Sequence, residues 1–357
     1  MIDSIEQFNI EFLPTHGILN LISEIDEFKG KWTALQNLSP ERLLALRRVA
    51  TIESVGSSTR IEGVKLTDRE VETLLSNLKQ YSFKSRDEEE VAGYAEAMEL
   101  VFESWRELLP TENHIKQLHS VLLKFSSKDT AHRGRYKKLS NNVVAFDADG
   151  KEIGVVFETA SPFETALAME KLVNWLNRAI EGKAIHPLLI VAVFVVSFLA
   201  IHPFQDGNGR LSRILTTLLL LRFGYEYVPY ISLESIIEDN KDSYYKALRQ
   251  TQKTLREAEA RTDWEKWCLF FLKCLKKQKD KLAAKLEREK IIAQILPKLS
   301  SDILALLKEH ERLSIAEIEA VTKANRNTLK VRLRELVRDN FIEQNGKARS
   351  TWYRLKA

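Results

Sequence analysis

The chain has 357 residues, of which 44% are hydrophobic and 29% charged, with only 13 glycines and 8 prolines. This composition excludes a chain that is disordered overall and is typical of a soluble helical protein, and the length favours about two domains. Because 54 Lys and Arg stand against 50 Asp and Glu, the net charge of +4 identifies no partner, and local clusters must be examined instead.

The N-terminus and the apolar runs indicate where the chain is expected to reside. No basic segment is followed by an apolar one at the N-terminus, so we predict no secretion signal and a cytoplasmic location. The apolar run at 188–201 is shorter than the roughly 20 residues that span a bilayer, and we interpret it as a buried core helix without membrane contact. Cys268 and Cys274 lie in an apolar stretch and are predicted to be core thiols.

The first hundred residues are patterned as helices. We expect a short helix at 18–28 and a longer one that begins at Ser39-Pro40-Glu41 and runs towards Val55. Gly63 is placed to end a turn, and 67–70 has the spacing of a capping box. Ser58 and Glu62 would share one face if their segment is helical.

Further helices are predicted at 88–105, 111–125, 162–179, 233–252 and 264–275, from the spacing of their apolar residues. His119 lies on the apolar stripe of the second, and we interpret it as a hydrogen-bonded packing residue rather than a ligand. The last of these helices is expected to close the domain. Residues 276–290 are rich in charge, which predicts an exposed connecting helix.

The helical period is interrupted by a predicted β-hairpin, with strands at 141–146 and 153–157 around an Asp/Gly turn at 147–150. A lone hairpin in a helical domain has no sheet to complete. Its free edge could accept an extended segment of another chain, and a surface ornament is the alternative.

The last sixty residues read as a separate domain that begins after Pro297. Three short helices followed by a hairpin, 341–355, predict a winged helix-turn-helix. Residues 298–357 hold 13 Lys and Arg against 8 Asp and Glu, so this part carries most of the excess positive charge. DNA contact and protein interaction both remain open for it.

We therefore predict a mainly α fold in four parts: an N-terminal helical region, a helical core domain with the hairpin, a charged linker helix and a winged helix-turn-helix domain. Their expected bounds are 1–105, 106–275, 276–297 and 298–357.

The densest polar cluster, His202 to Arg213, stands between two apolar segments. If one helix stops near His202 and the next begins near Arg210, residues 206–209 lie at a helix N-terminus, where free N–H groups and the dipole attract anions. The two glycines in that stretch let the backbone approach a phosphate. Arg210 and Arg213, three residues apart, could grip phosphates from one helix face.

Two further residues of this cluster suit phosphate chemistry. Asp206 is a candidate oxygen ligand for Mg²⁺, which binds through one or two carboxylates plus substrate phosphates. His202 is placed to take a proton from an attacking hydroxyl near neutral pH. The structural alternative is a helix corner whose arginines pair with acids, but the concentration of all these residues in one stretch favours a nucleotide-phosphate site.

This stretch resembles the signature of the Fic family, H-x-F-x-[DE]-G-N-G-R-x-x-R, at every defined position: His202, Phe204, Asp206, Gly207, Asn208, Gly209, Arg210 and Arg213. The resemblance extends over about residues 10–275. Ser58-x-x-x-Glu62-Gly63 is similar to the inhibitory motif of the family, and the hairpin lies where the family has a target-binding flap, here Asn141, Asn142, Val143, Val144 and Ala145. A C-terminal winged helix is a known accessory of such proteins.

The resemblance implies transfer of AMP from ATP to a Ser, Thr or Tyr hydroxyl of a target protein or of the chain itself. On this implication His202 is the base and Asp206 holds Mg²⁺ on the α- and β-phosphates. Asn208 and the backbone around Gly207 and Gly209 stabilise the transferring phosphate, Arg210 and Arg213 bind the β- and γ-phosphates, and Phe204 packs under the loop. A phosphate-transferring relative, Doc, carries Lys in place of Gly207.

The resemblance also implies a brake, in which Glu62 pairs with Arg213 and the motif crowds the γ-phosphate. A DNA-binding regulator with a nucleotide-sensing site, removal of AMP, and other phosphotransfer remain alternatives. The target and the oligomeric state, including a homodimer, remain open.

Overall fold

The computed structural model describes residues 14–34, 40–78, 82–141, 143–146, 152–255, 262–295, 298–339, 341–346 and 351–356. The chain divides into two compact units, Met1–Lys281 and Leu282–Ala357. The boundaries predicted within the first unit, at 105 and 275, stay predictions.

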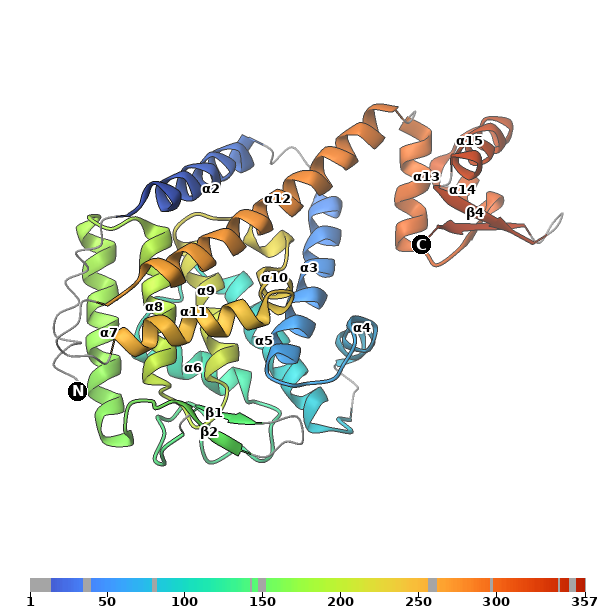
Figure 1. The fold of residues 1–357 in the computed structure, drawn as a ribbon. Coiled ribbons are helices and arrows are strands. Elements are labelled where there is room, and N and C mark those ends of the chain that lie inside the picture. The colour runs from blue at the N-terminus through green and yellow to red at the C-terminus, as the bar shows by residue number, and fades with distance from the viewer. Residues whose placement is uncertain are drawn as a thin grey trace. The chain divides into compact units, whose positions relative to one another are not determined.

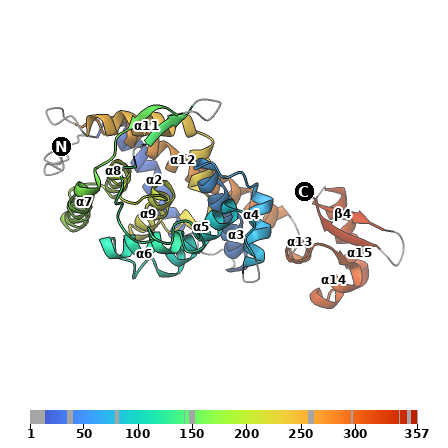
Figure 2. The same cartoon turned by 90° about the horizontal axis from the view of Figure 1, so that it is seen from below.

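The first unit is built from helices that surround one apolar helix (Figures 1 and 2). Its elements in chain order are α2 (His16–Ala34), α3 (Pro40–Ile61), α4 (Asp68–Ser76), α5 (Arg86–Ser104), α6 (Glu112–Leu122), β1 (Val143–Phe146), β2 (Glu152–Phe157), α7 (Pro162–Gly182), α8 (Pro187–Ile201), α9 (Asn208–Arg222), η2 (Val228–Tyr230), α10 (Leu233–Glu238), α11 (Lys241–Thr254) and the first part of α12 (Glu265–Ile295). The predicted helix at 233–252 is therefore two helices: Asp239 is the C-cap of α10, and Asn240, whose backbone is not helical, is the N-cap of α11.

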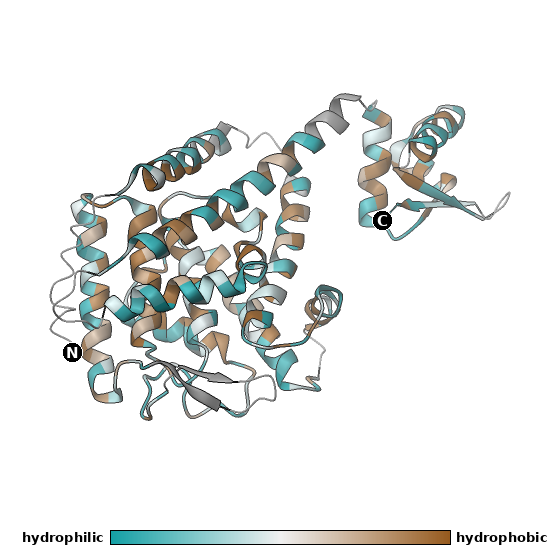
Figure 3. Cartoon of the chain, in the orientation of Figure 1, coloured by the Kyte–Doolittle hydropathy of each residue, from teal (hydrophilic) through white to brown (hydrophobic). Residues whose placement is uncertain are grey.

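The central helix α8 confirms the predicted core helix. Every side chain from Leu188 to Leu199 is buried, and the helix packs against α7, α9 and α11. Figure 3 shows apolar residues along α8 and α9 and hydrophilic ones along much of α12. Such burial on all faces fixes the end of α8, and hence the residues that follow it, relative to the rest of the unit.

Helix α3 ends in a Schellman motif that sets the position of Glu62. Gly63 has a positive φ of 103°. Its N–H donates to the carbonyl of Arg60, and the N–H of Val64 donates to the carbonyl of Thr59. A left-handed residue at this place is usually glycine, because glycine has no Cβ to clash. Gly63 thus ends the helix, as predicted, and Glu62 is the residue at the cap.

The predicted hairpin strands are present as β1 and β2, which pair antiparallel, with Val144 opposite Val155. The turn between them lies outside the described residues. In Figure 1 this pair lies at the end of the unit where α8 ends and α9 begins.

The charged helix α12 differs from the prediction of an exposed linker that follows a closing helix at 275. It is one continuous helix from Glu265 to Ile295. Leu282 and Leu286 are buried, and the buried Gln278 side chain donates to the carbonyl of Ile231. Gln278, Leu282 and Leu286 are spaced four apart and so share one covered face, which composition alone does not reveal. Cys268 and Cys274 are buried on this helix as free thiols, as predicted.

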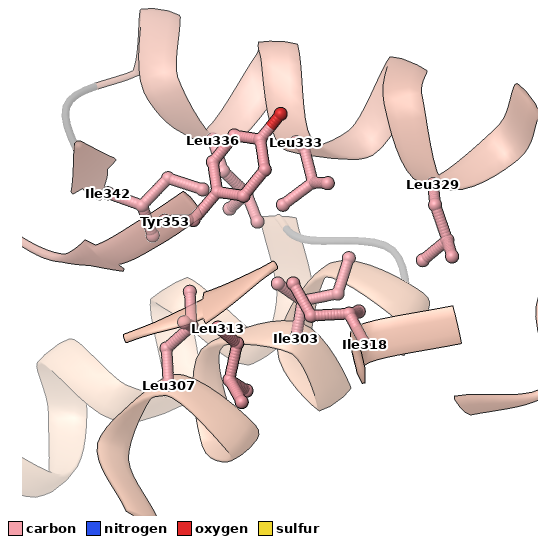
Figure 4. Packing of buried hydrophobic residues seen from close by; sticks show 9 residues of the cluster. All are labelled: Ile303, Leu307, Leu313, Ile318, Leu329, Leu333, Leu336, Ile342 and Tyr353. Atoms are coloured by element: carbon pink, nitrogen blue, oxygen red, sulfur yellow. The ribbon is translucent and has the colours of Figure 1, made fainter. Parts of the chain in front are cut away.

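The second unit contains α13 (Lys298–Glu309), β3 (Leu313–Ser314), α14 (Ile315–Thr322), α15 (Arg326–Arg338), β4 (Ile342–Asn345) and β5 (Trp352–Leu355). Its strands form an antiparallel sheet in the order β3-β5-β4, of which only the two-residue β3 was not predicted. Figure 4 shows its core, formed by Ile303, Leu307, Leu313, Ile318, Leu329, Leu333, Leu336, Ile342 and Tyr353. One apolar cluster therefore joins α13, α14 and α15 to the sheet.

Across the described ranges, none of the helices is both long enough and apolar enough to cross a membrane.

Candidate active site

His202 is the residue that ends α8. It adopts a left-handed conformation, with φ 53° and ψ 60°, and its N–H donates to the carbonyl of Phe198. Its Nδ1 lies 3.4 Å from the carbonyl oxygen of Leu199. Since a carbonyl can only accept, this contact places the proton on Nδ1 and leaves Nε2 as the basic nitrogen. Burial, together with the charge of Lys137, lowers the pKa of His202 to about 4, so the imidazole is neutral at pH 7.

The loop after His202 is braced by a reciprocal pair of hydrogen bonds. The N–H of Phe204 donates to Oδ1 of Asn208 at 2.9 Å, and Nδ2 of Asn208 donates back to the carbonyl of Phe204 at 2.7 Å. Both side chains are buried, and the Phe204 ring stacks on His119 with a centroid distance of 3.8 Å. Because Asn208 is used within the loop, its side chain positions the backbone rather than facing outwards.

His119 supports the loop from α6, as the predicted packing residue. Its Nδ1 accepts from the N–H of Gly134 at 2.9 Å, so its Nε2 must carry the proton that it donates to the carbonyl of Asp206 at 3.0 Å. Burial lowers the pKa of His119 to about 4. The His119 ring is therefore neutral, and its two hydrogen bonds join the Asp206 turn to Gly134.

Helix α9 begins at Asn208, two residues earlier than predicted. Gly207 is its N-cap, with a left-handed φ of 79° and no side-chain cap. The N–H of Gly207 donates to Oδ1 of Asp206 at 2.6 Å. The first N–H groups of α9 thus open onto the turn, which is the arrangement that binds anions at a helix N-terminus.

Arg213 is buried on α9 and is held by α3. Its Nε donates to Oγ of Ser58 at 2.8 Å, and its Nη2 donates to the backbone carbonyl of Ser58 at 2.9 Å and to Oε1 of Glu62 at 2.7 Å. Burial alone would raise the pKa of Glu62, but the charge and hydrogen bond of Arg213 outweigh it and leave that pKa below its usual value. Glu62 is therefore ionised, and the structure brings together the pair that the sequence placed 151 residues apart.

The Glu62 carboxylate also lies against the first turn of α9. A Cβ added at Gly209 would overlap its Oε1 and come within 2.9 Å of its Cδ. Gly209 thus has the close approach that was expected of it, but in this structure the approaching anion is the protein's own carboxylate. The Glu62 carboxylate therefore lies near the N-terminus of α9, at the position where the sequence predicted a phosphate.

Arg60 anchors the last turn of α3. Its Nε and Nη2 donate to the two carboxylate oxygens of Glu238 at 2.7 and 3.0 Å, and its Nη1 donates to Oδ1 of Asp68 at 2.8 Å. A guanidinium held by two carboxylates fixes its backbone more firmly than a single pair would. The turn that carries Glu62 is thereby fastened to α10 and α4.

Arg210 is buried with partners of its own. Its Nη1 lies 2.7 Å from Oε2 of Glu90, and its Nη2 donates to Oδ1 of Asp206 at 3.2 Å. A helix–turn–helix corner that binds no anion would also pair these two arginines with acidic side chains. One observation points beyond a corner: among the described residues, buried nitrogens of both side chains make no hydrogen bond. They are Nε and Nη1 of Arg210, of which Nη1 has only its ion pair with Glu90, and Nη1 of Arg213. Buried donors without acceptors are costly, and an anion would satisfy them.

The base of the hairpin is tied to the His202 turn. Asn141 donates through Nδ2 to the carbonyl of Phe204. The buried Lys137 donates to Asn141 and Thr159 at 2.8 Å each and to the carbonyl of Ile201 at 3.1 Å. Of the predicted flap residues, Asn142 lies outside the described residues, and β1 is described as backbone only.

Some residues of the site were not singled out from the sequence. Arg86 and Glu90 contact Asp206 and Arg210 from 120 positions away, and Lys137 contacts the carbonyl of Ile201 from 64 positions away, so no spacing in the sequence connects them to the turn. The i, i+4 spacing of Arg86 and Glu90 is visible, yet it is that of an ordinary helical pair.

The fold and the site define a mainly helical protein in which a glycine turn places the N-terminus of α9 and two buried arginines beside a neutral histidine. Residues 109–220 match the Fic/DOC family, and this part of the chain is a Fic/DOC domain. "Protein adenylyltransferase Fic" of Drosophila mojavensis is 27% identical over 230 residues, which cover 64% of this chain and 42% of that protein. The Drosophila persimilis protein of the same name is 30% identical, with 64% and 41% covered. The chain thus spans less than half the length of these relatives.

Solved structures agree on the fold. A Fic family protein from Desulfovibrio desulfuricans G20 superposes with a TM-score of 0.64 at 24% identity, covering 97% of this chain and 98% of that one. A Fic domain containing signaling protein from Bacteroides thetaiotaomicron has a TM-score of 0.59 at 27% identity, covering 72% and 94%.

Proposed function

We propose that this chain is an autoinhibited protein adenylyltransferase that transfers AMP from ATP to a protein hydroxyl. The observation that carries the proposal is the neutral His202, with a free Nε2, next to a glycine turn that exposes the N-terminus of α9 beside two buried arginines with unsatisfied donors. The name of the Drosophila relatives supports the same activity.

In the proposed reaction the target hydroxyl oxygen attacks the α-phosphorus of ATP. Nε2 of His202 accepts the hydroxyl proton, a bond forms between that oxygen and the α-phosphorus, and the bond from the α-phosphorus to the bridging oxygen breaks. Pyrophosphate leaves with the bonding electrons. A histidine that is neutral at pH 7 is in the correct state to act as this base.

The chain's own groups would bind and orient the triphosphate. The N–H groups at the start of α9 offer donors to phosphate oxygens, and Gly207 and Gly209 leave the backbone uncovered. The partnerless N–H groups of Arg210 and Arg213 would add charged donors that become satisfied only when an anion is present.

Asp206 would hold Mg²⁺, and its chemistry fits that ion. Its side chain is 36% exposed, and the charges of Arg210 and Arg86, with the Gly207 N–H, keep its pKa low against the opposing effect of burial. Among the described residues, no three His, Cys, Asp or Glu side chains gather as a metal cage. A single carboxylate suffices when phosphates supply further oxygens, and bound Mg²⁺ would neutralise phosphate charge.

We infer that Glu62 is the brake. It holds the Nη2 of Arg213 and lies against Gly209, so it competes with phosphate for the same guanidinium and for the same space. The Schellman turn at Gly63 and the contacts of Arg60 hold the glutamate there. A target segment would pair along the β1–β2 hairpin, whose base is tied to the His202 turn through Asn141 and Lys137.

Mass spectrometry of the Glu62→Gly protein after incubation with Mg²⁺ and ATP tests the reaction and the donor group. The proposal expects an added AMP on a Ser, Thr or Tyr hydroxyl, which is absent from the Glu62→Gly/His202→Ala protein. An added phosphate, or AMP on both proteins, would contradict it. Loss of AMP from a pre-modified protein in the parent but not in Glu62→Gly would instead support removal of AMP.

A second candidate function, duplex DNA binding by the second unit, is favoured by one face of α15. We infer that this unit is a winged helix, with α15 in the place of the helix that enters the major groove. Asn327, Lys330 and Arg334 are exposed on one face. In contrast to Arg332, which pairs with Glu335, neither Lys330 nor Arg334 has an ion pair among the residues described.

A gel shift with genomic DNA fragments tests this second function. Lys330→Ala/Arg334→Ala should weaken binding, whereas Lys298→Ala/Lys308→Ala removes the same charge from exposed positions on α13 and should weaken it less. Equal loss in the two double variants would indicate charge attraction without a docking face. No binding by the full chain would remove the function.

A further inference from the structure

Four charged side chains beside the glycine turn form a closed ring of ion pairs. Nε of Arg86 lies 2.7 Å from Oε1 of Glu90, and Oε2 of Glu90 lies 2.7 Å from Nη1 of Arg210. Nη2 of Arg210 lies 3.2 Å from Oδ1 of Asp206, and Oδ2 of Asp206 lies 2.9 Å from Nη2 of Arg86. The ring joins the start of α5 to the start of α9.

The two oxygens of Asp206 have different partners. Oδ1 accepts from the Gly207 N–H at 2.6 Å and from Arg210, both within its own turn and helix. Oδ2 accepts from Arg86 on α5. A cation bound by this carboxylate without disturbing the turn would therefore need Oδ2, the oxygen that Arg86 contacts.

Arg86 is held at a place that does not favour a cation by itself. It is the first residue of α5, where the positive end of the helix dipole repels positive charge. Its side chain is 47% exposed, so it can move into solvent at little cost in buried contacts. Glu90 grips a different nitrogen from the one that contacts Asp206, and Asp129 also attracts the guanidinium. Arg86 can thus release Asp206 while remaining paired.

We propose that Arg86 makes a second inhibitory contact at this site. In the resting protein its guanidinium pairs with Oδ2 of Asp206 and competes there with a divalent metal ion. This inference rests on the proposed nucleotide site. It differs from the Glu62 brake in position and in chemistry: Glu62 is an anion in place of phosphate, and Arg86 is a cation in place of metal. The phosphate would thus compete with one negatively charged side chain, Glu62, and the metal ion with one positively charged side chain, Arg86.

The test measures how much Mg²⁺ tightens binding of a non-hydrolysable ATP analogue. Affinity is measured by calorimetry with excess Mg²⁺ and with EDTA, in full-length Glu62→Gly/His202→Ala protein, which has neither brake nor base. Adding Arg86→Met removes the competing charge. In EDTA, the Asp206 carboxylate then lacks Arg86 and repels the triphosphate. In Mg²⁺, the metal ion can bind Asp206 without first breaking the Arg86–Asp206 pair. The ratio of the two affinities should rise about 1.5- to fivefold, the range for a partly exposed ion pair.

Two matched variants make the outcome decisive. Arg47→Met removes a guanidinium whose ion pair with Glu99, at 2.7 Å, joins α3 to α5 away from Asp206. This control should leave the affinity ratio unchanged. Arg86→Lys keeps a charge and should return the ratio towards the parent value. An unchanged or lower ratio in Arg86→Met, as for a phosphate-binding arginine, overturns the proposal. If the analogue fails to bind the Glu62→Gly/His202→Ala protein in either condition, the nucleotide site itself is wrong.

Discussion

Nη2 of Arg213 lies 2.7 Å from Oε1 of Glu62, a contact between the end of α3 and the first turns of α9. The carboxylate follows the C-terminus of one helix, where the dipole disfavours it, and reaches the N-terminus of another, where the dipole favours it. Ser58, one turn earlier, takes two further donors of the same guanidinium. Arg213 thereby donates to three protein oxygen atoms, as it could to the oxygens of a phosphate.

Removal of the Glu62 carboxylate should raise the proposed transfer activity. In Glu62→Gly, auto-modification with labelled ATP should rise on the order of tenfold or more, because the contribution of one hydrogen bond to a charged group, about 1.5–3 kcal/mol, no longer opposes productive binding. Glu181→Gly is a matched control, since Glu181-Gly182 also stands at a helix end but is exposed and far along the chain. A rate that is equal in the parent and in Glu62→Gly would remove the brake from the account.

The pH dependence should show a base that is neutral well below pH 6.5. Burial lowers the pKa of His202 to about 4, so protonation inactivates the base only as the pH falls through that value. For Glu62→Gly protein, kcat/KM for ATP should therefore change less than about twofold between pH 7.5 and 5.5, whereas a histidine with the ordinary pKa of about 6.5 would lose about tenfold. A tenfold loss over this range would show that the imidazole is solvated and the buried environment absent.

Lys137 should influence both the stability of the unit and the pKa of His202. Lys137→Met leaves the acceptors at Asn141, Thr159 and the Ile201 carbonyl without this donor, at a cost of about 1–3 kcal/mol for each one left unsatisfied, so Tm should fall by several degrees. Because the Lys137 charge lowers the pKa of His202, its loss should move the acid limb of the kcat/KM profile to higher pH. Lys124→Met, on an exposed pair with Glu96, is the control and should move neither quantity.

Gly209 offers a test of contact that does not depend on catalysis. In the parent, Gly209→Ala should lower Tm, because the new Cβ overlaps the Glu62 carboxylate and forces it away from Arg213. In a Glu62→Gly background the same change should be neutral or stabilising by up to about 1 kcal/mol, since alanine is the better helix former. Thermal unfolding of the four proteins gives the coupling. Additive effects would mean that Glu62 does not lie against α9 in solution.

The sequence by itself determined the local elements and the chemistry of the turn. The apolar run of α8, the capping box at Thr67 and the helix end at Gly63 are properties of neighbouring residues, and all three were confirmed. The residue types between His202 and Arg213 predicted an anion site for the same reason. Local patterns were less reliable where a helix depends on distant partners, as in α12, whose buried Leu282 and Leu286 look like ordinary interruptions of a charged stretch.

Only the tertiary structure decided which charges meet. Glu62 faces Arg213, and Arg86 faces Asp206, because α3, α5 and α9 pack against one another and bring the ends of the three helices together. Nothing in the spacing of Arg86 and Glu90 distinguishes them from an exposed helical pair, since the energy of an ion pair depends on where the fold places the partner and how much water it excludes. The sequence carried the groups that we propose to bind a phosphate and a metal ion, and the packing of three helices placed Glu62 beside Arg213 and Arg86 beside Asp206.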